Sequence, residues 1–247
     1  MIKDKKIYFA SDFHLGLKNE SDSRIRENKI VNWMNSIIHD CETLYLVGDL
    51  FDVWFEYKRV VPKGYVRFLA KIAEFTDKGI NVNVFTGNHD MWMFNYLEKE
   101  CGAKLFHQPI TVEHGNKIFY IGHGDGLGPG DHGYKFIKKI FRNTFCQWLY
   151  ARMHPNFGIA LATYFSRKGY KKKHADNVYF GDDKEYLFRF CKEYLKSNKV
   201  DYFVFGHRHL PLEKKIDSSA YINLGDWLTY CTYAVYEDNQ LNLKTFK

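Results

Sequence analysis

Residues 7–14 read Ile-Tyr-Phe-Ala-Ser-Asp-Phe-His, an apolar and aromatic run that leads directly into two side chains able to bind a metal, Asp12 and His14. A short apolar run of this kind predicts a buried strand. In open α/β sheets, ligands bind beyond the carboxyl ends of the strands, which is where these two side chains fall. The stretch therefore predicts a strand of an α/β sheet and also the edge at which a site would form.

The same arrangement, an apolar run followed by polar residues, occurs four more times along the chain. The apolar runs are at 44–47, 82–85, 118–121 and 202–205, and the motifs that follow them are Gly48-Asp49-Leu50-Phe51-Asp52, Gly87-Asn88-His89-Asp90, Gly122-His123-Gly124-Asp125 and Gly206-His207-Arg208-His209. One Asp or His at a strand end is usually structural. Five such coincidences in one chain argue against that explanation and favour a shared site at one edge of a sheet.

The five motifs together supply seven candidate metal ligands. These are Asp12, His14, Asp49, Asn88, His123, His207 and His209. The set is too rich in imidazole for calcium or magnesium, and it lacks the thiolates of a structural zinc site. Shared between two ions roughly 3.5–4 Å apart, with one carboxylate bridging, it suits a hydrolase centre for displacement at phosphorus. We expect two divalent ions, Mn(II) foremost, with Fe(II) or Zn(II) as alternatives.

The order of the motifs carries a family resemblance. The series D-x-H, G-D-x-x-D, G-N-H-D, G-H and G-H-x-H, between Ser11 and His209, resembles the calcineurin-like metallophosphoesterase superfamily. The resemblance implies an α/β fold in the form of a four-layer α/β/β/α sandwich with a helical lid insertion. It also implies two ligand sets that share Asp49 as the bridge: one is Asp12, His14, Asp49 and His209, and the other is Asp49, Asn88, His123 and His207. In this scheme His89 stabilises the phosphate or protonates the leaving oxygen, and Asp52 orients its imidazole.

Within the superfamily, the chain most resembles the UDP-2,3-diacylglucosamine pyrophosphatases of the lipid A pathway. The resemblance rests on Ser-Asp-Phe-His-Leu-Gly at 11–16, Gly-Asp-Leu-Phe-Asp-Val-Trp at 48–54, His-Gly-Asp at 123–125, and Asp131-x-x-Tyr134. It implies cleavage at the α-phosphorus of a UDP-linked acylated glucosamine, which gives UMP and the lipid sugar 1-phosphate. The candidate substrate contacts are Asn88, Asp125, Asp131, Tyr134, Ser166 and Lys168. One departure is His89, the general phosphoesterase residue, where the better-known pyrophosphatases carry Arg.

Composition predicts one compact enzyme spanning residues 1–247. The chain is 45% hydrophobic and 18% aromatic, which excludes a disordered protein and allows a large core. The five cysteines form no C-x-x-C pair, which favours free thiols in a reducing compartment. We expect no secretory signal at residues 1–6 and no membrane-spanning helix, because no stretch of 18 apolar residues occurs. The free thiols favour a cytoplasmic protein, and the resemblance to the lipid A enzymes implies a peripheral position on the cytoplasmic face of the inner membrane. We expect a monomer, although the sequence does not determine the oligomeric state.

Strand and helix signals alternate along most of the chain. Apolar residues recur at helical spacing over 30–38, 65–75 and 187–195, and the acidic residues at 182–185 predict the start of the last of these helices. Gly115-Asn116 predicts a hairpin turn, and the tail predicts strands near 220–224, 230–236 and 240–246. This order predicts two packed sheets with helices outside them.

The segment at about 127–178 differs in kind. Within it, residues 132–175 hold ten Lys or Arg, ten aromatic residues and no acidic residue, although the whole chain carries a net charge of only +7. A basic stripe, defined as Lys135, Lys138, Lys139 and Arg142, is spaced as one face of a helix. The segment could be a solvated helix packed on the core, or it could bind nucleic acid, which its broad apolar face disfavours. The pattern better suits a helix on anionic lipid, and an apolar helical hairpin that houses acyl chains is the version that the resemblance favours.

Three functions remain open at this point. The first is hydrolysis of the lipid-linked UDP-sugar at an anionic membrane surface, with nucleic acid not expected as a partner. The second is a soluble phosphodiesterase or pyrophosphatase acting on a nucleotide or nucleic acid, which His89 favours and the apolar hairpin disfavours. The third is a non-catalytic scaffold, which is disfavoured because all seven ligand positions are filled.

Overall fold

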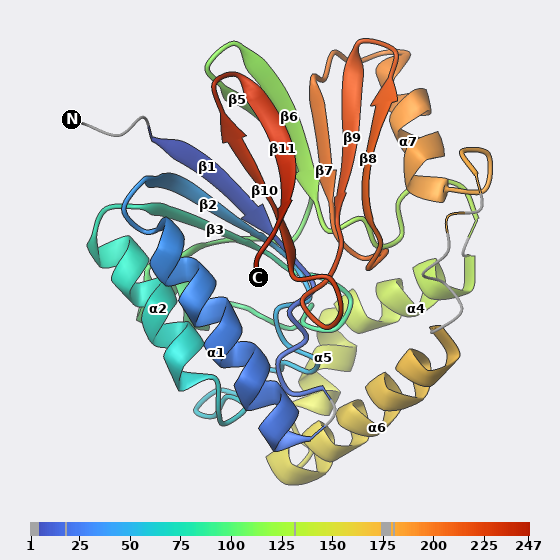
Figure 1. Ribbon diagram of the computed structural model, residues 1–247. Coiled ribbons are helices and arrows are strands. Elements are labelled where there is room, and N and C mark those ends of the chain that lie inside the picture. The colour runs from blue at the N-terminus through green and yellow to red at the C-terminus, as the bar shows by residue number, and fades with distance from the viewer. Residues whose placement is uncertain (1–4, 18, 131, 174–178, 180) are drawn as a thin grey trace.

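The computed structural model describes residues 5–17, 19–130, 132–173, 179 and 181–247, with the backbone alone for 169–173, and shows two stacked sheets with helices on their outer faces (Figure 1). The first sheet has the strand order β11-β10-β1-β2-β3-β4. Its strands are β1 (Lys6–Ala10), β2 (Cys41–Val47), β3 (Asn81–Phe85), β4 (Lys104–Phe106), β10 (Thr232–Glu237) and β11 (Gln240–Thr245). The strands β1 to β4 are parallel, and β10 is antiparallel to both of its neighbours.

The second sheet has the order β5-β6-β7-β9-β8. Its strands are β5 (Ile110–His114), β6 (Lys117–Gly122), β7 (Tyr202–Phe205), β8 (Pro211–Ile216) and β9 (Ser219–Leu224). The central strands β6, β7 and β9 are parallel, whereas β5 and β8 are antiparallel edge strands. In both sheets the parallel strands therefore have their carboxyl ends at the same edge.

Three separate hydrophobic cores hold four layers together. One core packs α1 (Glu20–Ile37) and α2 (Val66–Asp77) on the first sheet, and it includes Trp33 and Phe68. A second core lies between the sheets, where Phe9 of β1 stacks on Phe119 of β6 with ring centroids 5.9 Å apart. A third packs α7 (Tyr186–Leu195) on the second sheet. The predicted two-sheet sandwich with outer helices is confirmed.

The regular elements agree with the sequence except where they are short or lack an apolar pattern. The five strands that precede the motifs, the hairpin between β5 and β6, and the tail strands are all present. The sequence analysis did not identify α3 (Tyr96–Cys101), β4 or β8. It also placed the start of α7 too early, since the helix begins at Tyr186, and Asp182, Asp183 and Glu185 precede it.

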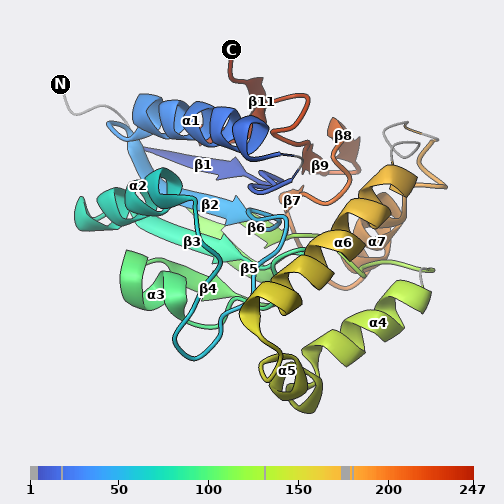
Figure 2. The same cartoon turned by 90° about the horizontal axis from the view of Figure 1, so that it is seen from below.

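The basic and aromatic segment forms three helices rather than a two-helix hairpin. These are α4 (His132–Arg142), α5 (Thr144–Tyr150) and α6 (Pro155–Lys173), and together they are called the helical insert below. Figure 2 shows the helical insert beyond the carboxyl ends of β1, β2 and β3, outside the two-sheet body. Among the described helices, none combines the length and the apolar character needed to cross a bilayer.

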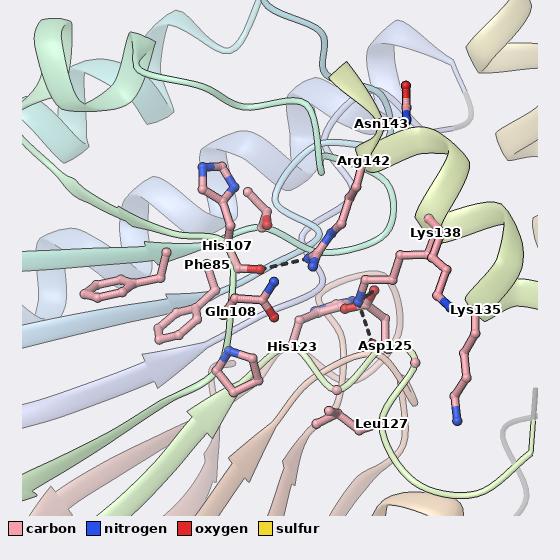
Figure 3. Close-up of a pocket in the computed structure, with 16 residues that line it drawn as sticks. Phe85, His107, Gln108, His123, Asp125, Leu127, Lys135, Lys138, Arg142 and Asn143 are labelled. Atoms are coloured by element: carbon pink, nitrogen blue, oxygen red, sulfur yellow. Dashed lines mark hydrogen bonds and ion pairs between the residues drawn. The ribbon is translucent and has the colours of Figure 1, made fainter. Parts of the chain in front are cut away.

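The orientation of α4 corrects the expectation that its basic stripe forms a free cationic surface. Lys138 forms an ion pair with Asp125, Lys135 donates to the carbonyl of Gly128 at 2.6 Å, and Arg142 donates to the carbonyl of His107 at 2.8 Å (Figure 3). These three residues face the sandwich, whereas Lys139, the fourth residue of the stripe, has no hydrogen bond or ion pair with any residue that the structure describes. The two helices α4 and α5 also expose large apolar side chains: Phe136, Ile137, Ile140, Phe141, Phe145, Trp148 and Leu149. The basic side chains face inward because the opposing surface of the sandwich offers the carboxylate of Asp125 and the carbonyls of Gly128 and His107, which pair with cations.

A buried glutamate of α1 caps the start of α2. The residue before α2, Tyr65, offers no side-chain cap, and the Glu27 carboxylate accepts from the main-chain N–H groups of Arg67 at 3.0 Å and Phe68 at 3.2 Å. Glu27→Ala would leave both amides unpaired. We expect it to lower the free energy of unfolding by about 1–2 kcal/mol, which urea denaturation would measure. Glu27→Gln keeps an acceptor and should lose less; equal losses in the two variants would contradict the capping role.

Candidate metal centre

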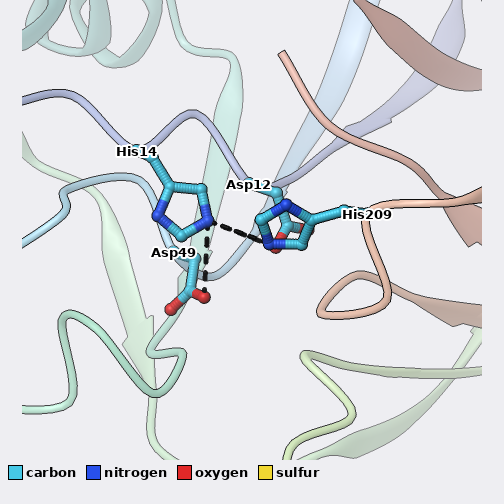
Figure 4. A group of neighbouring side chains, drawn as sticks. All are labelled: Asp12, His14, Asp49 and His209. Atoms are coloured by element: carbon cyan, nitrogen blue, oxygen red, sulfur yellow. Dashed lines mark hydrogen bonds and ion pairs between the residues drawn. The ribbon is translucent and has the colours of Figure 1, made fainter. Parts of the chain in front are cut away.

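The motifs predicted from the sequence meet at the carboxyl edge of the sandwich. Asp12, His14, Asp49 and His209 form one group whose potential ligand atoms all lie within 4.8 Å of one another (Figure 4). Asp49 also belongs to a second group with His123 and His207, which meets the same limit. The seventh candidate, Asn88, has its Oδ1 3.3 Å from Nε2 of His123. The structure therefore brings all seven candidates together, in two groups that share Asp49.

The backbone at this edge is held in an uncommon conformation. Ten described residues other than glycine have a positive φ, and half of them are candidate ligands: Asp12 at 55°, His14 at 44°, Asp49 at 52°, His207 at 69° and His209 at 54°. Such left-handed conformations cost roughly 1–3 kcal/mol each and persist only where the surroundings impose them. Main-chain hydrogen bonds between the β1 and β2 loops do so, from Asp12 N to Gly48 O at 3.0 Å and from His14 N to Asp49 O at 2.9 Å.

Two motif glycines allow the carboxylates to lie against the backbone. A Cβ atom at Gly87 would fall within 3.0 Å of the Asp49 carboxylate, and one at Gly206 would do the same with the carboxylate of Asp12. The amide of His207, next to Gly206, donates to Asp12 Oδ2 at 3.0 Å. The glycines of the third and fifth motifs are thus required by close packing around the acidic side chains.

The geometry of Asp49 fits a ligand that two ions share. Its Oδ1 accepts from the main-chain N–H of His89 at 2.8 Å. Its Oδ2 is buried, accepts no hydrogen bond from the described residues, and lies 3.2 Å from Nε2 of His123 and 3.7 Å from Nε2 of His14. A buried carboxylate oxygen without a donor is costly, and a cation between it and the two imidazoles would satisfy it. The donor set of carboxylates, imidazoles and one amide suits borderline divalent metals.

The electrostatics of the centre favour positive charge. Burial by itself would raise the pKa of Asp49, but the imidazoles of His123, His89 and His14 outweigh burial and hold that pKa well below its usual value. Asp12 behaves alike, because His209 and His14 outweigh its burial and depress its pKa. Conversely, burial would lower the pKa of His123, yet Asp49 raises it to about 10. The carboxylates therefore stay ionised, which is the state that metal binding requires.

Two aspartates support this centre, and the sequence analysis gave neither a role. Asp90 is fully buried and accepts from the amides of Leu50 and Gly87, both at 2.7 Å, so it ties the second motif to the third. Asp226 lies 3.4 Å from Nδ1 of His209 and can orient that ring. A signal for Asp226 existed, because it follows β9 in the same strand-end position as the other motifs.

His89 and Asp52 lie beside the first group and contact the helical insert. Nδ1 of His89 is 3.0 Å from the carbonyl of Asp52 and 3.4 Å from its Oδ1. The hydroxyl of Ser166, on α6, donates to the same Oδ1 at 2.6 Å and lies 3.3 Å from Nδ1 of His89. Burial would lower the pKa of His89, but Asp49 and Asp52 outweigh burial and raise it. Ser166, predicted as a substrate contact, thus touches the predicted catalytic pair directly.

Of the other predicted substrate contacts, two lie beside the candidate metal centre. Tyr134 donates to Asp125 at 2.6 Å, and its ring centroid is 6.4 Å from that of His207, so these two lie next to the second group. Lys168 is exposed on α6. Asp131 lies outside the described residues.

Known proteins resemble this chain over most of its length. The family model described as calcineurin-like phosphoesterase matches residues 5–211. A UDP-2,3-diacylglucosamine hydrolase of Porphyromonas gingivalis is 39% identical, with 98% of each chain covered. A protein of the same name from Histophilus somni is 26% identical over 90% of this chain and 92% of its own. Among solved structures, an archaeal phosphodiesterase is 17% identical, with a TM-score of 0.48, and covers 98% of this chain and 99% of its own.

Removal of the shared carboxylate should affect both ions. We expect Asp49→Ala to lose most of both equivalents of metal, whereas His14→Ala and His123→Ala should each deplete mainly one, because only Asp49 belongs to both groups. Elemental analysis of purified, metal-loaded variants measures this. Glu113→Ala, which removes an exposed carboxylate on β5, is the control and should bind as the unaltered chain does. Two full equivalents on Asp49→Ala would exclude the bridging arrangement.

Proposed function

The chain belongs to the calcineurin-like phosphoesterase family, and from this premise we propose that it hydrolyses the diphosphate of UDP-2,3-diacylglucosamine to UMP and the acylated sugar 1-phosphate. Family membership makes it a metal-dependent phosphoester or pyrophosphate hydrolase. The choice of substrate is carried by the relative from Porphyromonas gingivalis, whose similarity extends over nearly the full length of both chains. The reaction would place the protein in the lipid A pathway.

Two divalent ions would be held at the centre with Asp49 shared between them. We assign Asp12, His14 and His209 to one ion and Asn88, His123 and His207 to the other, and we favour Mn(II) over Fe(II) or Zn(II). When bound, such ions activate a water and neutralise charge on the phosphate oxygens. The roles of the surrounding side chains follow from their own contacts.

We assign His89 to the phosphate or to the leaving oxygen. An Nδ1–H that donates to the Asp52 carbonyl leaves Nε2 of the same ring to bind or protonate an oxygen of the substrate. Its raised pKa favours the protonated form, which both roles need. Asp52 holds the ring through its carbonyl and carboxylate, and Ser166 holds the carboxylate in turn. Asn88, Asp125, Tyr134 and Lys168 remain our candidates for contacts to the substrate.

The helical insert is suited to the acyl chains. Its exposed apolar side chains include Phe136 at 65% and Phe145 at 63% on α4 and α5, with Phe157 at 61% and Phe165 at 60% on α6. Apolar side chains exposed to this degree and gathered on one part of a molecule mark a surface for an apolar partner. We propose that they bind the acyl chains and bring the protein to the cytoplasmic face of the inner membrane. The basic stripe, which the sequence suggested would bind anionic lipid, faces mainly inward. We therefore assign membrane binding to the exposed apolar side chains instead.

A second candidate substrate class is a soluble nucleotide diphosphate or phosphodiester. It is favoured by His89, which stands where the resemblance to the pyrophosphatases calls for Arg. The deciding experiment is an assay of metal-loaded protein against UDP-2,3-diacylglucosamine, UDP-glucose, ADP-ribose and bis(p-nitrophenyl) phosphate, with the products identified. We expect UMP and an acylated sugar 1-phosphate as the main products. A clear preference for the water-soluble diphosphates would overturn the proposed substrate.

His89 is expected to contribute to rate and not to metal affinity. His89→Ala should keep both metals and lose about 10²–10⁴-fold in kcat, the usual range for a general acid or base. His89→Arg should retain more activity than His89→Ala, since a guanidinium can also bind the phosphate. Steady-state kinetics with metal analysis of each variant tests this. Full turnover of His89→Ala across the pH range would remove the residue from the mechanism.

Polar substitutions in the helical insert should affect acylated substrate alone. Trp148 is 50% exposed on α5, and Ile159 and Leu161 are half-buried on α6. We expect Trp148→Gln, Ile159→Asn and Leu161→Asn to raise KM for UDP-2,3-diacylglucosamine because apolar contacts with the acyl chains are lost. Turnover of bis(p-nitrophenyl) phosphate should stay unchanged, which also serves as the control for folding. An unchanged KM for the lipid would leave the acyl chains without this binding surface.

A further inference from the structure

A cavity of about 460 Å³ lies between α4 and the edge of the sandwich, next to the second ligand group (Figure 3). Its floor includes His123 and Asp125, so it opens directly onto the candidate metal centre. Its size falls within the roughly 300–1,000 Å³ that is common for small-molecule sites. The roles assigned above to the helical insert and the metal ligands leave this space without an occupant.

The wall that α4 contributes is cationic. The whole basic stripe lines the cavity, and Asp125 is the single acidic residue among its lining residues. Lys138 neutralises Asp125, and Lys135 and Arg142 are tied to main-chain carbonyls. Lys139 is exposed and, among the described residues, has no hydrogen-bond or ion-pair partner. The cavity therefore has an excess of positive charge and one free ammonium group, which suits an anionic ligand.

The opposite wall combines apolar surface with free polar groups. Phe106 and Pro109 supply apolar surface, and Gln108 lies between them in the chain, with its side-chain amide exposed at the cavity. Figure 3 shows the Gln108 amide on the side of the cavity that faces α4. No described residue bonds this amide, so it can both donate and accept. Apolar surface beside a bidentate amide suits a planar base with alternating donors and acceptors.

The two faces of α4 separate the two kinds of chemistry in the proposed substrate. The inward face is cationic and lines the cavity, whereas Phe136 and Ile140 on the other face are exposed and apolar. An acyl chain would gain nothing from the cationic cavity and would leave its polar groups unpaired. A nucleotide has the opposite requirement, because its phosphate needs cations and its base needs a polar partner and an apolar surface.

We propose that this cavity binds the uridine monophosphate half of the substrate, with Lys139 contacting the phosphate and Gln108 the uracil edge. The inference rests on the proposed function, because it names the subsite for one half of that substrate. It leaves the acyl half to the exposed apolar side chains of the helical insert, and the bond to be cleaved then lies beside His123, on the floor of the cavity.

Titration calorimetry of the metal-loaded protein with UMP tests the assignment. We expect saturable binding that Lys139→Glu weakens at least tenfold. Lys99→Glu makes the same charge change at an exposed lysine of α3 outside the cavity and should bind UMP normally. Gln108→Ala should lower the affinity for UMP but leave the affinity for ribose 5-phosphate unchanged, because ribose 5-phosphate has no base. UMP affinity that is the same in Lys139→Glu and Lys99→Glu would overturn the proposal.

Kinetics separates a failure of this inference from a failure of the proposed function. Lys139→Glu and Gln108→Ala should each raise KM for UDP-2,3-diacylglucosamine, and Gln108→Ala should raise it by a larger factor than it raises KM for bis(p-nitrophenyl) phosphate, which has no nucleobase. If the unaltered protein cleaves the acylated substrate but neither variant changes KM or UMP affinity, the cavity is not the nucleotide subsite and the proposed function stands. If UMP binding depends on Lys139 but the acylated substrate is not cleaved, the subsite stands and the proposed substrate is wrong.

Discussion

The Asp49 carboxylate is buried at the junction of the two sheets, and most of the local structure serves to keep it ionised there. Removing a carboxylate from water costs several kcal/mol unless neighbouring groups compensate. One of its oxygens is satisfied by the amide of His89, and the other faces the imidazoles of His14 and His123. No described residue donates to that second oxygen. A cation would complete this arrangement. The buried oxygen without a donor, and not only the types of residue present, therefore marks the site as a metal centre.

The strained backbone of the motifs follows from the same constraint. Ligands that come from β1, β2 and the loop after β7 must converge on one point. The backbone has a positive φ at five of them, Asp12, His14, Asp49, His207 and His209, whose side chains belong to the two ligand groups. The cost is offset by hydrogen bonds between the loops and by the buried aspartate Asp90, which joins two motifs. The parallel strands fix where the loops begin, so the fold and the site depend on each other.

The strand ends and the seven candidate ligands could be predicted from the sequence because two signals coincided there. An apolar run locates a buried strand, and a metal ligand just after it locates the edge of the sheet. The face that α4 turns to the core could not be predicted in this way. The helical pattern shows that a basic and an apolar face exist, but the choice between them depends on Asp125 and the carbonyls of Gly128 and His107, which only the folded chain brings opposite α4. Short elements such as β4 carried too few residues to form a pattern.

The helical insert contacts the reaction centre from two sides, and this gives its position a chemical consequence. On one side α4 reaches the second ligand group, because Tyr134 and Lys138 both bond Asp125, two residues after His123. On the other side α6 reaches the first group, because Ser166 bonds the carboxylate that orients His89. The same helices carry the apolar surface proposed for the acyl chains and the cationic wall proposed for the nucleotide. A substrate that filled both surfaces would hold α4 and α6 in the places that set Asp125 and Asp52, so binding energy from the remote ends of the substrate would be used to order the groups around the reacting phosphate.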